Sequence, residues 1–218
     1  MLKDLPVETM SSKDWYHHLL NKNILEEEDE NETFRQQPCK AELLHPMVDW
    51  ESAWISARCP GISNENRSFL FRLLHNLHPT RSRLHRLNPR LNPLPSCSFC
   101  LDSDEEETTA HIYGGLCRQS SLAINWLISV LQMMDPSATP ERVIFLQLDP
   151  INSDCMTECI FLIAESLSYI WERRRENKQI EMEQMKAKIR SKCFILSKSR
   201  NYGMHGTNLI ALIVTGGT

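Results

Sequence analysis

The segment SCSFCLDSDEEETTAHIYGGLC, residues 96–117, decides how the middle of this chain folds. It carries three cysteines and one histidine in the order C-x2-C-x10-H-x5-C, at Cys97, Cys100, His111 and Cys117. Thiolate sulfur and imidazole nitrogen are donors that suit Zn²⁺, and four of them complete its tetrahedral shell. A C-x2-C pair lets two sulfur atoms reach one ion from a tight turn. The segment therefore predicts a structural zinc site with no open position for a catalytic water.

Two other interpretations of the same spacing stay open. A CxxC pair can be a redox pair, and cysteines can share a loop with a histidine without binding a metal. A redox pair normally opens a helix after a strand, whereas this one follows prolines at 89, 93 and 95 and precedes a run of acids. Outside the segment, Cys155 and Cys159 have no nearby partner to complete a second site. Their spacing favours packing in the core.

Composition limits the class of protein. The chain has 218 residues, of which 41% are hydrophobic and 24% charged, enough for one good domain with appendages. The N-terminus resembles no signal peptide, so the eight cysteines favour thiols or metal ligands over disulfides. No apolar run is long enough to span a bilayer. We expect an intracellular protein, nuclear or cytoplasmic, with no membrane partner.

Helical patterns flank the cysteine segment on both sides. Upstream, the sequence predicts helices around Trp50 and Trp54, from Ser63 to Leu77, and from Thr80 to Leu87. Downstream, helices are expected after Ser120 or Ser121 and after the Thr139-Pro140-Glu141 start signal. A single helix is predicted over 153–196, with an apolar first half and a polar, projecting second half. The predicted fold is all-α, with an embedded CCHC zinc-knuckle loop and a long projecting C-terminal helix.

These patterns divide the chain into three parts. Residues 1–45 contain the acidic run EEEDENE and are predicted to form a largely disordered arm. Residues 46–175 are the predicted helical zinc-binding domain. Residues 176–218 are predicted to be a projecting basic helix followed by a disordered tail.

Residues 67–90 carry one sign of charge, with no acid among them. The cations that we predict to contact nucleic acid are Arg67, Arg72, Arg81, Arg83, Arg86 and Arg90. Guanidinium groups match phosphate oxygens, and several such contacts would make binding to RNA or DNA depend on salt. The alternative is an ordinary solvated helix face.

The order of these features resembles a known family. A W-x3-W pair, the helix FLFRLLHNLHPTRSRLHRL, a proline-rich lead into SCSFC, the phrase EEETTAH and a closing Cys117 occur together over residues 46–135. This order is similar to the zinc-binding domain C-terminal to the reverse transcriptase of non-LTR (LINE-type) retrotransposons. The resemblance implies that the four ligands bind zinc and that the module helps a polyprotein hold RNA or target DNA. HIYGGLC has five residues between histidine and cysteine, where that family usually has four.

The sequence lacks the residues that a polymerase needs. Reverse transcriptases hold two magnesium ions with paired aspartates, and this chain has no Asp-Asp dipeptide. It also lacks the P-loop, G-x-S-x-G and H-E-x-x-H patterns. We therefore expect a nonenzymatic module. Two alternatives are a protein-interaction module that pairs or self-associates through the 153–196 helix, and a decayed retroelement fragment without function.

Overall fold

The computed structural model describes residues 45–59, 62–100, 105–151 and 155–197. Contacts divide the chain into residues 1–38 and 39–218, and every described residue belongs to the second unit. The predicted acidic arm, apart from its last residue, and the tail after residue 197 lie outside the described part. Within that part the chain is helical, without a β-strand, which confirms the all-α prediction.

The helices follow one another as the sequence patterns predict, with one short addition and one break. Their bounds are α3 Trp50–Ala57, α4 Asn64–Leu74, α5 Arg81–Leu87, α6 Thr109–Tyr113, α7 Ser121–Gln132, α8 Pro140–Ile144, α9 Met156–Arg175 and α10 Met182–Ser197. The addition is α6, which lies inside the cysteine segment. The break separates α9 from α10.

Three predicted helix starts are confirmed by their capping hydrogen bonds. The side chain of Ser63 accepts a hydrogen bond from the backbone of Asn66 at the start of α4. Thr80 caps α5 and Thr139 caps α8 in the same way. Each cap satisfies a backbone N–H that the first helical turn leaves without a partner.

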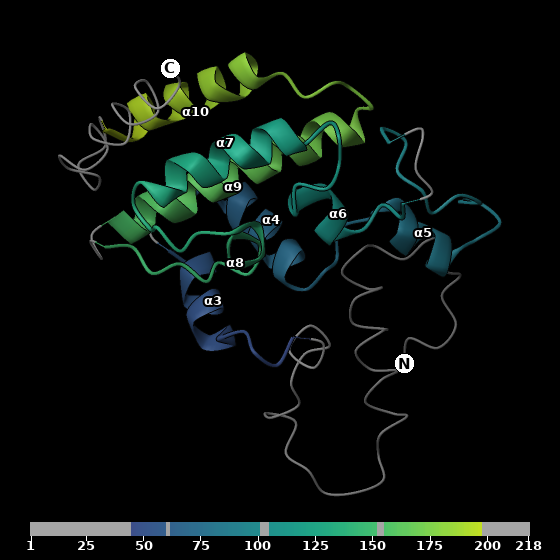
Figure 1. The fold of residues 1–218 in the computed structure, drawn as a ribbon, viewed down its shortest axis with the longest axis horizontal. Helices are drawn as coiled ribbons and strands as arrows, with labels where there is room; N and C mark the ends of the chain where they lie inside the picture. Colours follow the sequence, from purple (N-terminus) through teal and green to yellow (C-terminus); the bar gives the residue numbers. More distant parts are fainter. Residues whose placement is uncertain (1–44, 60–61, 101–104, 152–154, 198–218) are drawn as a thin grey trace, which may run out of the picture. The chain divides into compact units, whose positions relative to one another are not determined.

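Helix α9 lies at the centre of the core. It packs against α3, α4, α7 and α10, and α7, α9 and α10 lie side by side in Figure 1. Its apolar residues from Cys159 to Leu167 are buried on nearly all sides. A helix that is covered all round is typical of the centre of a helical domain. The apolar first half of the predicted long helix is therefore confirmed as a packing element.

The prediction of one helix over 153–196 that projects from the body was wrong. Helix α9 ends at Arg175, and Asn177 adopts a left-handed backbone conformation, with φ of 53°. The chain then reverses, and α10 packs on α9 with Met185, Ile189 and Cys193 buried. The predicted domain boundary at residue 175 therefore falls between two helices, α9 and α10, that pack on each other.

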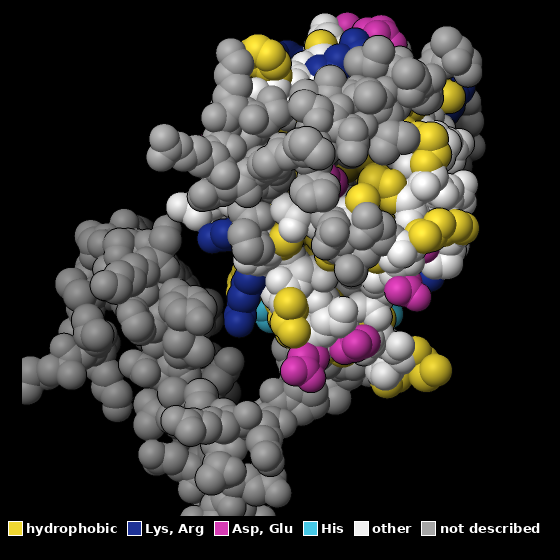
Figure 2. All heavy atoms as spheres, turned by 90° about the vertical axis from the view of Figure 1, so that its left-hand side faces the viewer, with side chains coloured by type: hydrophobic (Ala, Val, Ile, Leu, Met, Phe, Trp, Pro, Cys, Tyr) yellow, Lys and Arg dark blue, Asp and Glu magenta, His cyan; other side chains and the backbone are white. Residues whose placement is uncertain are grey.

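The described surface mixes side-chain types. Exposed apolar residues include Met47, Ile55, Leu122 and Phe194. On the face drawn in Figure 2, hydrophobic, basic and acidic side chains are interspersed. No helix in the described part of the chain is both long and apolar enough to cross a membrane.

Candidate metal centre

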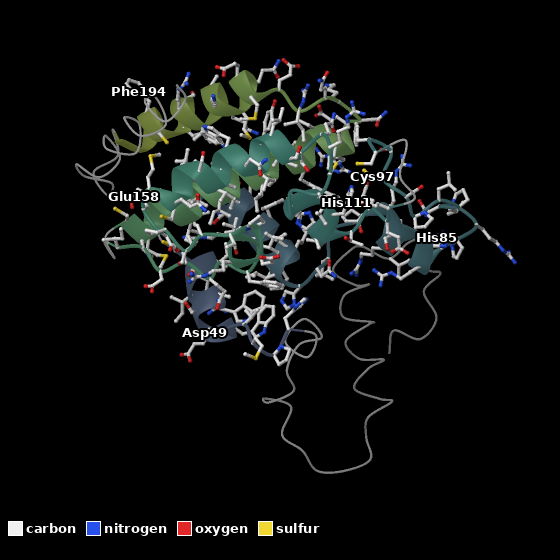
Figure 3. All side chains as sticks on the ribbon, viewed as in Figure 1. Asp49, His85, Cys97, His111, Glu158 and Phe194 are labelled. Atoms are coloured by element: carbon white, nitrogen blue, oxygen red, sulfur yellow. The ribbon has the colours of Figure 1, made fainter. Side chains whose placement is uncertain are left out.

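The four predicted ligands come together in space, although 20 sequence positions separate the first from the last. Cys97 and Cys100 lie on the turn that follows the proline-rich stretch. His111 lies in α6, where Thr108 accepts a hydrogen bond from its backbone N–H and fixes the start of the helix. Cys117 lies in the short connection between α6 and α7. Figure 3 shows Cys97 and His111 close to each other, with His85 on α5 farther away.

The donor atoms have the spacing of a tetrahedral shell. All four lie within 4.8 Å of one another. The sulfur of Cys117 lies 3.9 Å from that of Cys97 and 3.8 Å from that of Cys100, and His111 Nε2 lies 3.5 Å from Cys100 Sγ. Metal–sulfur bonds of about 2.3 Å at tetrahedral angles place two sulfurs about 3.8 Å apart. A disulfide requires about 2.05 Å, so the cysteines are held as separate thiols.

A short backbone bridge closes the loop between the first two ligands and α6. Ser96 and Glu106 pair as an isolated antiparallel β-bridge. Around it, the N–H of Cys97 donates to the carbonyl of Glu105 at 3.0 Å, and the N–H of Glu107 donates to Pro95 at 2.9 Å. The acidic residues 105–107 therefore have a structural role that their charge alone does not indicate.

The histidine is oriented by one of these acids. The carboxylate of Glu105 lies 3.0 Å from His111 Nδ1. Hydrogen bonding at Nδ1 leaves Nε2 to face the sulfur of Cys100. Metal-binding histidines almost always donate their second ring nitrogen to a carboxylate, a carbonyl or water. The observed arrangement is the one that a metal-binding imidazole needs.

Two glycines accommodate the five residues between His111 and Cys117. A Cβ atom at Gly114 would lie 2.4 Å from the carbonyl oxygen of Ala110. Any larger residue at this position would therefore force the backbone of α6 to shift. Gly115 has φ of 80°, which side chains disfavour. The turn brings the N–H of Cys117 to 3.1 Å from the carbonyl of His111. With five residues between His111 and Cys117, the sulfur of Cys117 therefore still lies close to the other three donor atoms.

The sulfur atoms differ in their electrostatic surroundings. Burial and the nearby sulfur of Cys117 raise the pKa of Cys100 to about 11, although the N–H of Arg118 opposes the shift. Burial also raises the pKa of Cys117, but the backbone N–H groups of Ser120 and Gln119 and the charge of Arg174 lower it overall. A divalent cation among the sulfurs would favour the thiolate form of all three.

Arg174 is a residue of the candidate site that the sequence pattern did not indicate. It lies 57 positions after Cys117, in the last turn of α9, and only 7% of it is exposed. Its guanidinium donates to Cys117 and Cys97 at 3.3 Å each, and to Glu107 at 2.5 Å. It also lies over the ring of Phe99, 4.9 Å from the centroid. The only available signal was its place in the basic run 173–175, which is also typical of a solvated helix end.

The six arginines predicted to contact nucleic acid divide into two groups. Arg67 and Arg72 are exposed on α4, where their guanidinium groups donate to backbone carbonyls of Cys59 and Ser68. The other four lie on α5 and after it. Of these, Arg81, Arg86 and Arg90 are exposed, and Arg83 is partly buried.

Two of the six serve the fold directly. Arg83 is partly buried and donates to the carbonyl of Asn76 at 2.7 Å, at the end of α4. Arg81 lies 4.0 Å from the carboxylate of Glu107. On the same helix, Ser82 donates to Glu106 at 2.6 Å. Two acidic residues of the cysteine segment, Glu106 and Glu107, therefore lie beside helix α5. The absence of acids within residues 67–90 did not indicate this contact.

Comparisons with known proteins add no relative. No family model matches the chain, and neither the curated proteins nor the solved structures give a significant match. Within the described residues, the CCHC group is the one cluster of His, Cys, Asp or Glu side chains that could hold a metal ion.

Proposed function

We propose that the chain is a nonenzymatic helical module built around one structural Zn²⁺ ion. The convergence of Cys97, Cys100, His111 and Cys117 at tetrahedral spacing carries this proposal. Thiolate-rich donor sets favour Zn²⁺ over Mg²⁺ or Ca²⁺, which prefer oxygen. Four protein donors would saturate the ion, so its chemical contribution would be to hold the loop and not to activate water.

The zinc would stabilise a segment that has little core of its own. Residues 88–100 and 105–108 form turns and extended chain, and among these described residues only the bridge at Ser96 and Glu106 pairs the backbone in a sheet-like way. In such sites the free energy of metal binding becomes free energy of folding. The metal would connect this segment to α6 and to the start of α7.

We further propose that the module contacts RNA or DNA through the exposed part of the 67–90 segment. Because Arg83 is partly buried and bonds to Asn76, the phosphate contacts fall to the five exposed cations, Arg67, Arg72, Arg81, Arg86 and Arg90. Several cations on adjoining elements suit a phosphate backbone, and such binding weakens steeply as salt rises.

Aromatic rings on α4 add to this surface. Phe71 is 52% exposed, and its ring centroid lies 4.3 Å from that of His75. Trp54 on α3 extends the group, 4.8 Å from His75. Exposed rings beside arginines are a common means of stacking unpaired bases. The pairing of rings with cations supports nucleic acid as the partner.

Titration of labelled single- and double-stranded RNA and DNA with the zinc-loaded chain tests this contact. Charge reversal at Arg86 and Arg90, and separately at Arg67 and Arg72, should weaken binding at least about tenfold and flatten its salt dependence. The same reversal at the exposed residues Arg175 and Lys178 is the matched control. Unchanged affinity in both test variants would exclude this surface, and no binding by the unmodified chain would exclude the nucleic-acid proposal while leaving the zinc proposal intact.

A further inference from the structure

Arg174 connects the metal centre to the C-terminal helices. It belongs to α9, yet its side chain reaches two of the four metal ligands, Cys97 and Cys117. A buried guanidinium requires compensating acceptors, because removal from water without partners is strongly unfavourable. The acceptors here are two sulfur atoms and the carboxylate of Glu107.

The position of Arg174 suits an anionic metal centre. Three cysteine thiolates and a neutral histidine around Zn²⁺ would carry a net charge of −1. The guanidinium of Arg174 donates to two of the three sulfurs and to the Glu107 carboxylate, so it would lie between two anionic groups. Hydrogen bonds to ionised acceptors are stronger than those to neutral ones. Direct contact of Arg174 with two ligand sulfurs would therefore stabilise the loaded centre.

A second contact joins the same two regions. The side-chain amide of Gln119, two residues after Cys117, donates to the carbonyl of Lys178 at 3.4 Å. Lys178 lies in the connection between α9 and α10. This connection is also held by Tyr169, whose hydroxyl donates to the carbonyl of Glu181, and by the buried side chain of Ile180.

We propose that Arg174 is a positioning residue that couples metal binding to the packing of the end of α9, the 176–181 connection and α10. This inference rests on the proposed zinc centre. Coupling between two sites is reciprocal. If Arg174 strengthens metal binding by a given free energy, metal binding stabilises these elements by the same free energy. The zinc would then hold together more than its own loop.

Metal affinity of the full chain, measured by competition with a chromophoric zinc chelator, tests the first half of the proposal. Arg174→Met should weaken zinc binding about 10- to 100-fold, as loss of a group that contacts the ligands typically does. Arg175→Met is the matched control, because it removes the same charge from the next, exposed position; it should bind within about twofold of the unmodified chain. Equal affinity for Arg174→Met and Arg175→Met would overturn the proposal, whereas absence of zinc from the unmodified chain would overturn the metal centre itself.

A second variant separates metal binding from misfolding. Arg174→Met leaves the buried Glu107 carboxylate with only the more distant Arg81, at 4.0 Å, so Arg174→Met is also combined with Glu107→Gln. Gln keeps an oxygen that can accept from the backbone N–H of Arg81, as Glu107 does. The double variant should fold and still bind zinc at least about tenfold more weakly than the Glu107→Gln single variant. Equal affinity of these two would show that the sulfur contacts of Arg174 do not matter.

Hydrogen exchange tests the coupling. Removing the metal from the unmodified chain should speed amide exchange in α10, residues 182–197, well beyond any change in α3, residues 50–57. In the double variant, the difference between loaded and metal-free protein in α10 should shrink. If α10 exchanges at the same rate with and without metal in the unmodified chain, the coupling does not exist.

Discussion

Glu105 orients His111, the one candidate ligand that is not a cysteine. Its carboxylate is 56% exposed and lies 3.0 Å from His111 Nδ1. Glu105→Ala should therefore lower zinc affinity by about tenfold, toward the weaker end of what such partners contribute, because water can replace an exposed carboxylate. Chelator competition measures this change.

The neighbouring acid provides the control for Glu105. Glu106 contacts Ser82 on α5 and no metal ligand among the contacts observed. Glu106→Ala should leave zinc affinity unchanged. Equal losses in the two variants would mean that the acids act through the net charge of the loop and not through the imidazole.

His78 is a neutral histidine that belongs to the core. Its ring lies against Phe69 and Trp171, with centroid distances of 4.7 and 4.6 Å. Nε2 lies 3.4 Å from the carbonyl of Phe69, and the hydroxyl of Tyr113 lies 3.3 Å from Nδ1. Donation from Nε2–H and from the tyrosine hydroxyl satisfies both nitrogens of the neutral ring.

Protonation of His78 should destabilise the fold. Burial lowers the pKa of His78 from 6.5 to about 4; the carbonyl of Phe69 opposes this shift and the charge of Arg72 adds to it. The unfolded chain therefore binds a proton that the folded chain excludes, and stability falls as pH drops from about 6.5 toward about 4, by up to ~3 kcal/mol. Urea unfolding at several pH values should show a smaller slope in His78→Gln. Identical slopes would mean that His78 ionises freely in the folded protein.

The clustering of the four candidate ligands was predictable from residue type and spacing, but the side chains that contact them were not. Cys97, Cys100, His111 and Cys117 form a local pattern in which chemistry and spacing agree. Arg174 reaches them only through the packing of α9, and a sequence read along the chain does not reveal a contact made by tertiary structure. The contacts of Glu106 and Glu107 with α5 were not predictable for the same reason.

Helix starts were more predictable than helix ends. Ser63, Thr80 and Thr139 form local caps that a short stretch of sequence specifies. Helices α4 and α9 end instead with Asn76 and Asn177 at φ of 51° and 53°. In both, the following N–H bonds back to the carbonyl five residues earlier, which is the Schellman arrangement.

The sequence contains a signal for the break between α9 and α10, and the prediction of one long helix did not take it into account. Asparagine tolerates the left-handed conformation, so Asn177 was a candidate helix end. The apolar positions Met185, Ile189 and Cys193, spaced four apart, form a stripe on the second half. A stripe of this kind indicates a helix that packs and does not project.

Helix α10 is also held to α9 by a largely buried ion pair. Lys192 lies 2.7 Å from the carboxylate of Glu165, which is almost fully buried and also accepts from Asn66 on α4 at 2.6 Å. Lys192→Met should lower the free energy of unfolding by about 2 kcal/mol, less than the ~3–5 kcal/mol for fully buried pairs, because Lys192 is 36% exposed. Urea denaturation measures the change.

An exposed pair in the connection before α10 is the control for Lys192. Lys178 pairs with Glu176, and their side chains are 57% and 43% exposed. Lys178→Met removes the same charge and should change stability by less than about 1 kcal/mol. A loss at Lys178 as large as that at Lys192 would mean that the buried carboxylate does not hold α10 in place.

At the scale of the molecule, the candidate metal centre lies between two parts of the helical core. Helix α4 precedes it and α7 follows it, and both pack on α9. The cysteine segment between them is held by one β-bridge, the short helix α6, the contacts of Arg174 and the hydrogen bond from Ser82 to Glu106. We expect a bound ion to hold the three sulfurs and His111 together at the centre of these contacts.

The most direct measurement is the metal content of the full chain, purified without an affinity tag and dialysed exhaustively, by elemental analysis. We predict about one zinc per chain, and loss of that zinc with a lower melting temperature in Cys97→Ser but not in Cys155→Ser, which changes a cysteine outside the cluster. A folded chain that carries no zinc, with a melting temperature that Cys97→Ser leaves unchanged, would contradict the account.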